Sequence, residues 1–250
     1  MDTEAIVLDC SDHGEADIIV TLFCRDVGRL TAIAKSAKKS QKRFVNKLEP
    51  FSFLNISYNR KNNRNLAFLA EADLLASFIN IRQDLELYAL ASIIDEFLLL
   101  GISEGEPDEK TFRLTLWALH SLDRKDQPRA ILALFLIRYF DYLGYRPDLD
   151  ICRACQTPVT PERRYTFHPG GGRILCSACS GDAGTRGREL SHGTLKILKA
   201  AQDCPLARLH RLKLAGPVLS EALALLHHYG RTIFQREINS WKTMQKYIGG

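Results

Sequence analysis

Four cysteines in two short pairs constrain this chain more than any other feature. They read Cys152-Arg-Ala-Cys155 and, after 20 intervening residues, Cys176-Ser-Ala-Cys179. Two C-x2-C pairs at this separation match the pattern of a four-cysteine zinc site, in which each tight turn supplies two thiolates to one tetrahedral ion. Prolines and glycines fill much of the sequence between the pairs. A metal ion would therefore supply folding energy that this insert cannot draw from a core of its own.

Two disulfides or four free buried thiols are the other interpretations of these cysteines. Disulfides need an oxidising compartment, and the acidic start of the chain is not followed by the apolar run of an export signal. The longest apolar run, Ala130–Ile137, is too short to cross a membrane. We therefore expect a cytoplasmic protein with a structural zinc ion, because four thiolates leave no open position for catalysis.

Charge is sorted along the chain. The formal net charge is +5, but residues 1–80 carry +1, residues 81–150 carry −5 and residues 151–250 carry +9. Within the first part, residues 35–64 hold nine Lys or Arg against one Glu, a local charge of +8. Such sorting indicates a polyanionic partner that binds particular faces.

The first 80 residues predict a small β barrel. Apolar or alternating stretches predict five short strands at 5–8, 17–24, 29–34, 51–58 and 66–72. Residues 11–14 predict a turn, and residues 35–43, which lack apolar periodicity, predict a solvated connection. Five strands with one long basic connection fit an OB-type barrel, and an SH3-like barrel fits nearly as well.

From Asp84 onwards the apolar residues recur at helical spacing. Helices are predicted to begin after Asp84, Asp108, Gln127 and Ser191, and again over 215–229 and 231–248. The helix after Gln127 is apolar on most faces, so we expect it at the centre of a bundle.

The predicted fold class is therefore α+β. An N-terminal five-stranded OB-type barrel (1–80) is followed by an α-helical domain (81–250) with an embedded four-cysteine zinc module (148–184).

Two basic elements flank the predicted barrel, namely the long connection and a turn after the fourth strand. Releasing counterions drives phosphate binding, and aromatic side chains can stack on unpaired bases. Phe44, inside the connection, is the better stacking candidate, whereas Phe51, Phe53 and Tyr58 fit the core. A merely solvated lysine-rich loop competes with this interpretation, but two basic elements on one barrel favour DNA or RNA binding. The predicted DNA-binding residues are Lys35, Lys38, Lys39, Lys42, Arg43, Phe44, Lys47, Arg60, Lys61 and Arg64.

No catalytic constellation is evident in the sequence. Ser11, His13 and Asp17 lie close together, but no nucleophile elbow accompanies them. The glycines at 170–172 are not followed by the Lys and Ser or Thr of a phosphate-binding loop. We therefore expect a protein that is not an enzyme.

Several short stretches follow one another in a characteristic order. They are Glu4–Leu8, Gly14–Asp17, Thr21–Phe23, Gly28–Leu30, the basic segment Lys35–Arg43, and Leu48–Phe51. The run Arg138–Pro147, which leads into Cys152, is the most specific match. Their order and spacing resemble the RecO family of bacterial recombination mediators over nearly the whole chain. Ser36-Ala37 stands where family members usually have a glycine, which bears on the local conformation of the loop.

The resemblance implies an OB fold, a helical domain and an embedded zinc module. It implies binding of single- and double-stranded DNA and annealing of complementary strands. It also implies partnership with RecR and with the acidic C-terminal tail of single-strand DNA-binding protein. Together these help to load the RecA recombinase onto coated DNA in the RecFOR pathway, which would associate the protein with the nucleoid.

The expected mechanism is charge screening, in which the basic residues hold two negatively charged strands close enough to pair. The +9 segment is a candidate second surface for DNA or for an acidic tail. The alternative function is a zinc-containing RNA-binding interaction module of the transcription or translation machinery, which would prefer RNA and would not anneal DNA. A zinc enzyme would need an open coordination position.

Overall fold

The computed structural model describes residues 1–40, 42–60, 66–180 and 187–248. Its internal contacts divide the chain into two compact units, Met1–Asp123 (unit 1) and Arg124–Gly250 (unit 2). The boundary that we predict between residues 80 and 81 separates the barrel from the helices, whereas the internal contacts separate the chain after Asp123. The predicted domain boundary stays a prediction. Within the described residues, no helix has the length and apolar character needed to cross a membrane.

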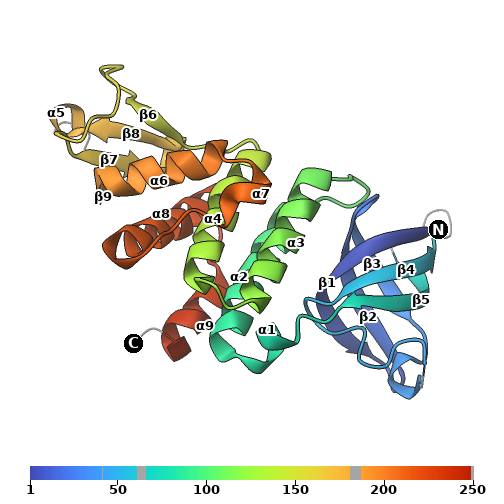
Figure 1. The fold of residues 1–250 in the computed structure, drawn as a ribbon. Coiled ribbons are helices and arrows are strands. Elements are labelled where there is room, and N and C mark those ends of the chain that lie inside the picture. The colour runs from blue at the N-terminus through green and yellow to red at the C-terminus, as the bar shows by residue number, and fades with distance from the viewer. Residues whose placement is uncertain (41, 61–65, 181–186, 249–250) are drawn as a thin grey trace. The chain divides into compact units, whose positions relative to one another are not determined.

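Unit 1 begins with a closed five-stranded barrel (Figure 1). Its strands are β1 (Asp2–His13), β2 (Asp17–Cys24), β3 (Gly28–Ala34), β4 (Phe53–Asn59) and β5 (Ala67–Ala76). They close in the order β1-β2-β3-β5-β4, with β3 parallel to β5 and the other pairs antiparallel. This order is that of the OB barrel, a five-stranded Greek key. The OB-type prediction is confirmed, and the SH3-like alternative does not fit.

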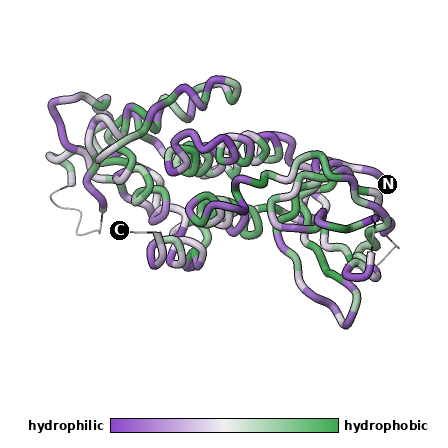
Figure 2. Tube along the Cα trace, turned by 60° about the horizontal axis from the view of Figure 1, so that its bottom comes forward, coloured by the Kyte–Doolittle hydropathy of each residue, from purple (hydrophilic) through white to green (hydrophobic). Residues whose placement is uncertain are grey.

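The barrel interior follows from alternation along the strands, which Figure 2 shows as recurring hydrophobic positions. In β3, buried and half-buried residues alternate strictly from Gly28 to Ala34. Side chains of successive strand residues point to opposite faces, so every second residue enters the core. Val20, Leu22 and Leu54 are fully buried members of this core.

The first strand is longer than its apolar residues predict. It pairs with β2 as far as His13, which lies opposite Asp17. The predicted turn at 11–14 is therefore wrong, and the chain turns at 14–16 instead. Ser11 and Asp12 are exposed, and polar side chains are compatible with a strand whose outer face meets water.

Three helices complete unit 1, namely α1 (Ile79–Gln83), α2 (Leu85–Gly101) and α3 (Glu109–Asp123). The short α1 is not predicted from the sequence. The Asp84 carboxylate accepts hydrogen bonds from the first amides of α2, and Asp108 accepts one from the Thr111 amide at 3.0 Å. Both predicted helix starts are therefore confirmed, since capping satisfies amides that have no partner within the helix.

The barrel packs against α3 through aromatic rings. Phe112 of α3 meets Phe23 and Phe53 edge to face, with ring centroids 5.3 and 6.3 Å apart. Phe23 and Phe112 are fully buried. These rings join strands and helices into one core within unit 1.

Gly28, the first residue of β3, lies directly against the segment between α2 and α3. Its φ is +66°, and a Cβ at this position would overlap the carbonyl oxygen of Glu106 and lie 2.7 Å from that of Ser103. The next amide, that of Arg29, donates to the Ser103 carbonyl at 3.0 Å. Glycine is needed here both for the left-handed backbone and for the close approach.

Unit 2 is a helical bundle with a small sheet (Figure 1). Its helices are α4 (Pro128–Tyr142), α5 (Ser177–Ser180), α6 (His192–Asp203), α7 (Leu206–Leu209), α8 (Gly216–Phe234) and α9 (Asn239–Ile248). Ten of the 15 residues of α4 are buried, and α4 packs against α6 and α8. Its predicted central position is confirmed.

The end of the chain differs from the prediction. One helix runs through to Phe234, and a separate helix begins at Asn239, whereas the sequence predicts a break near residue 230 and a tail helix over 231–248. Gln235, with φ of +51°, ends α8. The predicted cap of α6 is confirmed, because the Ser191 hydroxyl accepts a hydrogen bond from the Thr194 amide at 3.3 Å.

Candidate metal centre and nucleic-acid interface

The four motif cysteines are carried by a small sheet in unit 2. Its strands are β6 (Asp148–Cys152), β7 (Tyr165–His168), β8 (Arg173–Cys176) and β9 (Arg188–Leu190), in the order β6-β8-β7-β9. Strands β6 and β8 are parallel. Parallel strands end at the same edge of a sheet, so Cys152 and Cys176, the last residues of these strands, arrive side by side.

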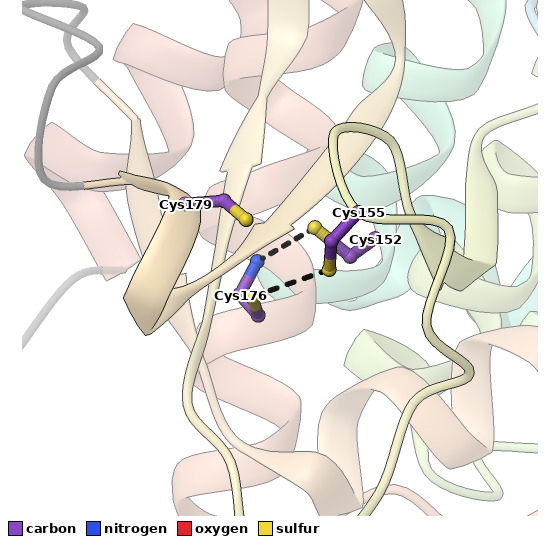
Figure 3. A group of neighbouring side chains, drawn as sticks. All are labelled: Cys152, Cys155, Cys176 and Cys179. Atoms are coloured by element: carbon purple, nitrogen blue, oxygen red, sulfur yellow. Dashed lines mark hydrogen bonds between the residues drawn. The ribbon is translucent and has the colours of Figure 1, made fainter.

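A tight turn returns each second cysteine to the same place. After Cys152 the chain turns through Gln156, which has φ of +58° and donates its amide to the Cys152 carbonyl at 2.8 Å. After Cys176 the chain enters α5 directly, so Cys179 follows within one helical turn. Figure 3 shows the four side chains pointing toward one another.

The sulfur positions form a compact group. All four Sγ atoms lie within 4.8 Å of one another, and those of Cys155 and Cys176 are 3.8 Å apart. A disulfide would need about 2.05 Å, and all four thiols are free. Cys152 and Cys176 are buried, while Cys155 is exposed. The chain therefore contains a four-cysteine cluster that could hold a metal ion.

Hydrogen-bond donors surround the sulfurs. The Cys176 amide donates to the Cys152 Sγ at 3.3 Å, and the Thr157 hydroxyl lies 2.8 Å from the Cys155 Sγ. The Thr157 hydroxyl and amide lower the pKa of Cys155 to about 6. Burial opposes ionisation of Cys152, but amide donors from Cys155, Cys176 and Ala154 outweigh it and lower its pKa. Hydrogen bonds that favour thiolates also favour metal ligation.

The thiol of Cys179 has the opposite tendency. Hydrogen bonding with Cys176 and Cys155 raises its pKa to about 12. Four thiolates within 4.8 Å repel one another, so some protons must stay on the group unless a cation balances the charge.

The basic connection between β3 and β4 is exposed over most of the predicted loop at residues 35–43, but it also contributes apolar residues to the barrel core. Its apolar residues Ala37, Phe44 and Leu48 are buried in the same cluster as the barrel interior. Phe44 is 4% exposed, and the Arg43 guanidinium carbon lies 5.0 Å from its ring centroid. The expectation that Phe44 stacks with bases stays a prediction, and it would require the connection to expose this ring.

Several of the predicted DNA-binding residues face acidic side chains from other parts of unit 1. The ion pairs are Lys35–Asp17 (2.6 Å), Lys38–Asp12 (2.9 Å), Lys47–Asp73 (3.5 Å) and Arg60–Glu104 (3.8 Å). Lys35 and the Ser36 amide hold the pKa of Asp17 below its usual value. The local charge of +8 counted along the sequence does not include these partners, so the barrel surface is less basic than the count suggests.

The remaining cations of this surface differ from one another. Lys39 and Lys42 are exposed, and within the described ranges neither forms an ion pair. Arg43 is exposed and reaches the carbonyl oxygens of Lys35 and Ala70 at 3.4 Å. Lys61 and Arg64 lie outside the described residues. A cation without an acidic partner can neutralise a phosphate without first breaking an ion pair.

A hollow of about 360 Å³ opens in unit 2, and no motif in the sequence points to it. Its lining residues come from α4, β9, α8 and α9, and include Arg129, Arg188, Leu223, His227, Arg231 and Trp241. The His227 ring stacks on Trp241 with centroids 4.3 Å apart. Burial, followed by the charge of Arg231, lowers the pKa of His227 to about 4. The hollow thus combines an apolar, aromatic wall with positive charge.

These features define a class: an α+β protein in which an OB-type barrel precedes a helical region with an embedded cysteine cluster. Two family models match the chain. "Recombination protein O N terminal" matches residues 1–78, and "Recombination protein O C terminal" matches residues 82–242.

Relatives match along nearly their whole length. "DNA repair protein RecO" of Syntrophus aciditrophicus is 32% identical over 98% of this chain and 95% of that protein. The protein of the same name in Syntrophobacter fumaroxidans is 31% identical over 98% and 96%. That of Caldanaerobacter subterraneus is 32% identical over 95% and 94%.

The chain therefore belongs to the RecO family, and its function lies in DNA repair and recombination. The family is one of non-enzymatic recombination mediators, which agrees with the expectation that this chain is not an enzyme.

Proposed function

We propose that this protein binds single- and double-stranded DNA, anneals complementary single strands and, with RecR, helps to load RecA onto DNA coated by single-strand DNA-binding protein. The observation that carries the DNA-binding part is the OB-type barrel with a basic connection laid across it. A positively charged groove or surface on such a barrel follows the backbone of an unpaired strand.

The proposed contacts are the cations of this surface. They are Lys35, Lys38, Lys39, Lys42, Arg43, Lys47 and Arg60, together with Lys61 and Arg64 outside the described residues. Lys39 and Lys42 are the primary contacts, because the ion pairs of the other lysines must open before a phosphate can replace the carboxylate. Binding that depends on phosphates alone is insensitive to base sequence and favours annealing of any complementary pair.

The four-cysteine cluster is proposed to hold one structural zinc ion. Tetrahedral ligands at the usual Zn–S distance of about 2.3 Å lie roughly 3.8 Å from one another, and the Cys155–Cys176 separation is 3.8 Å. Four thiolates fill the coordination sphere. The ion would therefore hold the two turns together and would have no catalytic role. When bound, it would also balance the charge of the thiolates.

The proposed protein partners are RecR and the acidic C-terminal tail of single-strand DNA-binding protein. The hollow in unit 2 is suited to the tail, because arginines such as Arg129, Arg188 and Arg231 surround Leu223 and Trp241. An acidic peptide with apolar side chains needs both kinds of contact.

Annealing of complementary strands already coated with single-strand DNA-binding protein tests the proposed function. This protein should accelerate annealing, and high salt should suppress the acceleration. Binding without annealing, together with a preference for RNA, would instead support an RNA-binding interaction module.

A pair of matched variants tests the proposed contacts. Lys39→Gln with Lys42→Gln removes two unpaired cations from the barrel surface. If each neutralises one phosphate, the slope of log K against log salt for single-stranded DNA should fall by about 1.4. Lys110→Gln with Arg113→Gln removes two exposed cations from α3 of the same unit and should leave the slope unchanged. Equal slopes for the two variants would refute the contacts.

A further inference from the structure

The two structural units carry net charges of opposite sign, and the unit that contains the basic connection is the acidic one. Unit 1 holds 14 Lys or Arg and 19 Asp or Glu, a net charge of −5. Unit 2 holds 20 and 10, a net charge of +10. The barrel's cations therefore belong to an acidic unit, and the large positive field originates in the other unit. A polyanion is attracted to the summed field as well as to individual contacts.

One segment of unit 2 concentrates this charge. From Cys204 to Ser220 the chain contains no acidic residue, and it carries the exposed side chains Arg208, His210, Arg211 and Lys213, here called the basic ridge. The ridge begins in α7, which is coloured orange in Figure 1.

The ridge has a defined backbone. Leu209 and Leu214 are 0% and 2% exposed and fix the segment to the bundle at both ends of the ridge. Within the ridge, the Arg211 amide donates to the Arg208 carbonyl at 2.9 Å and the Leu212 amide to the Leu209 carbonyl at 3.1 Å. Burying the leucines turns the intervening cations outward, so the ridge is preorganised.

The cations of the ridge are freer than those of the barrel. Among the described residues, Arg208 and Arg211 form no ion pair. Lys213 lies 3.7 Å from Asp126, with both side chains more than 60% exposed. An exposed pair at this distance contributes little, and Arg124 and Lys125 precede Asp126 in the sequence. Replacing this contact by a phosphate therefore costs little.

We infer that the basic ridge is a second binding surface for the phosphate backbone of single-stranded DNA, in addition to the barrel. This inference rests on the proposed function, because annealing needs two strands to be held at once. Arg208–Lys213 is folded into turns, so at a rise of about 1.5–2 Å per residue it spans roughly 10 Å, which matches about three phosphates at 3.4 Å per nucleotide in a strand. One chain would then hold one strand on each unit.

The chemistry of the ridge favours a nucleic-acid backbone over an acidic peptide. Its exposed side chains are all polar or cationic, and the leucines between them are turned inward or half-buried. A peptide tail gains affinity from apolar anchors, for which the hollow in unit 2 has Leu223 and Trp241. A row of cations without an apolar floor suits a chain of phosphates.

Short oligonucleotides of unrelated sequence provide the test. The full-length protein should bind two per chain at saturation, and a variant with Arg208→Gln, Arg211→Gln and Lys213→Gln should bind one. If each cation neutralises one phosphate, the salt slope of the lost site is about 2. The same variant should anneal complementary strands more slowly. A control with Arg163→Gln, Lys196→Gln and Lys246→Gln removes the same charge from exposed positions elsewhere in unit 2 and should behave as the unmodified protein.

Three outcomes separate this inference from the proposed function. If the barrel variant at Lys39 and Lys42 loses a strand and the ridge variant keeps both, the inference fails and the proposed function stands. If neither variant changes binding or annealing, the proposed DNA contacts fail as well. If the ridge variant binds DNA normally but loses a poly-glutamate peptide, the ridge is a protein-docking surface and the inference is overturned.

Discussion

The barrel of unit 1 and the small sheet of unit 2 are both β structures, yet they are held in different ways. The barrel strands contain 7 to 12 residues and enclose a continuous apolar core. The strands of the small sheet contain 3 to 5 residues. One face of the small sheet packs on α8, where Phe167 meets Tyr229 at 5.4 Å between ring centroids. At the edge where β6 and β8 end in Cys152 and Cys176 lies the cysteine cluster, which would hold the strands together if it binds a metal ion.

The difference shows how strand length decides what else a sheet requires. Long strands close on themselves and bury enough apolar surface to offset the entropy of ordering the chain. Short strands with glycine-rich connections bury less apolar surface, and the metal ion proposed for the four cysteines would supply the contacts that this sheet lacks. The two units should therefore respond differently to metal removal, to core mutation and to pH.

The largest effect is expected from Cys152→Ser. It removes a buried ligand at the end of β6, so the metal should be lost and unit 2 destabilised by about 5 kcal/mol, since structural zinc contributes roughly 10–16 kcal/mol in isolated zinc-finger peptides. Metal content and hydrogen exchange measure this. Exchange should rise in β6, β8 and α6, while the barrel strands stay protected. Ser180→Ala, beside the cluster, is the control. One retained equivalent of metal with unchanged exchange would refute the metal centre.

The corresponding test of unit 1 is Leu54→Ala in β4. Leu54 is fully buried in the barrel core, and truncating such a leucine costs about 3 kcal/mol through lost burial and the remaining cavity. Unit 1 should melt earlier, while the metal content of unit 2 stays the same. Asn55→Ala, at the exposed neighbouring position, should change the free energy of unfolding by less than about 0.5 kcal/mol. Loss of metal in Leu54→Ala would mean that the units do not unfold separately.

Acid should weaken unit 2 through His227. The folded-state pKa of His227 is about 4, below the usual value of about 6.5. Between these values the unfolded chain binds more protons, so stability is complete above pH 6.5 and declines as the pH falls toward 4. His227→Phe keeps a ring against Trp241 and removes this dependence. Between pH 7.5 and pH 5, the melting temperature of the variant should rise relative to that of the unmodified protein.

A difference in melting temperature that does not change with pH would contradict a lowered pKa of His227. Because metal release in acid affects both proteins, the comparison cancels it.

Unit 1 contains a buried carboxyl group whose effect on stability has the opposite pH dependence. Asp95 of α2 is 4% exposed, and within the described part of the chain neither carboxylate oxygen has a hydrogen-bond partner. Burial, assisted by the charge of Asp9, raises the pKa of Asp95. The folded state therefore holds the proton more tightly, and stability declines as the pH rises through the raised value. Asp95→Asn should raise the melting temperature of unit 1 at pH 8 and change it little near pH 4. A lower melting temperature at pH 8 would show that the charged carboxylate has an essential partner.

Local sequence patterns predict much of this fold and of the metal centre, because both depend on short-range rules. Alternation locates the strands, and Asp84, Asp108 and Ser191 cap their helices as expected. The cysteine spacing alone brings four sulfurs together. The polar ends of β1 are missed, since strand pairing there depends on β2 rather than on apolar residues. The burial of Phe44 is missed as well, because the connection folds back into the barrel.

The electrostatics of the candidate interface could not be predicted in the same way. Lys35 and Lys38 lie in a basic stretch, but their partners Asp17 and Asp12 come from the preceding strands. The hollow in unit 2 is assembled from four separate elements. Such features depend on contacts between residues that are distant in sequence, and local sequence patterns do not predict these contacts.

Gly28 of the barrel packs against Ser103 and Glu106, which are translated after all five barrel strands. The contacts of the finished barrel therefore depend on residues that the ribosome adds later. When the fifth strand ends at Ala76, the ring that covers Phe23 and Phe53 has still to be made. A ribosome that adds about 5–20 residues per second needs roughly 2–7 s to reach Phe112. During that interval Phe23 and Phe53 lack the ring of Phe112 that packs on them in the finished fold. Slower translation of residues 77–112 would lengthen this period and increase aggregation of the newborn chain.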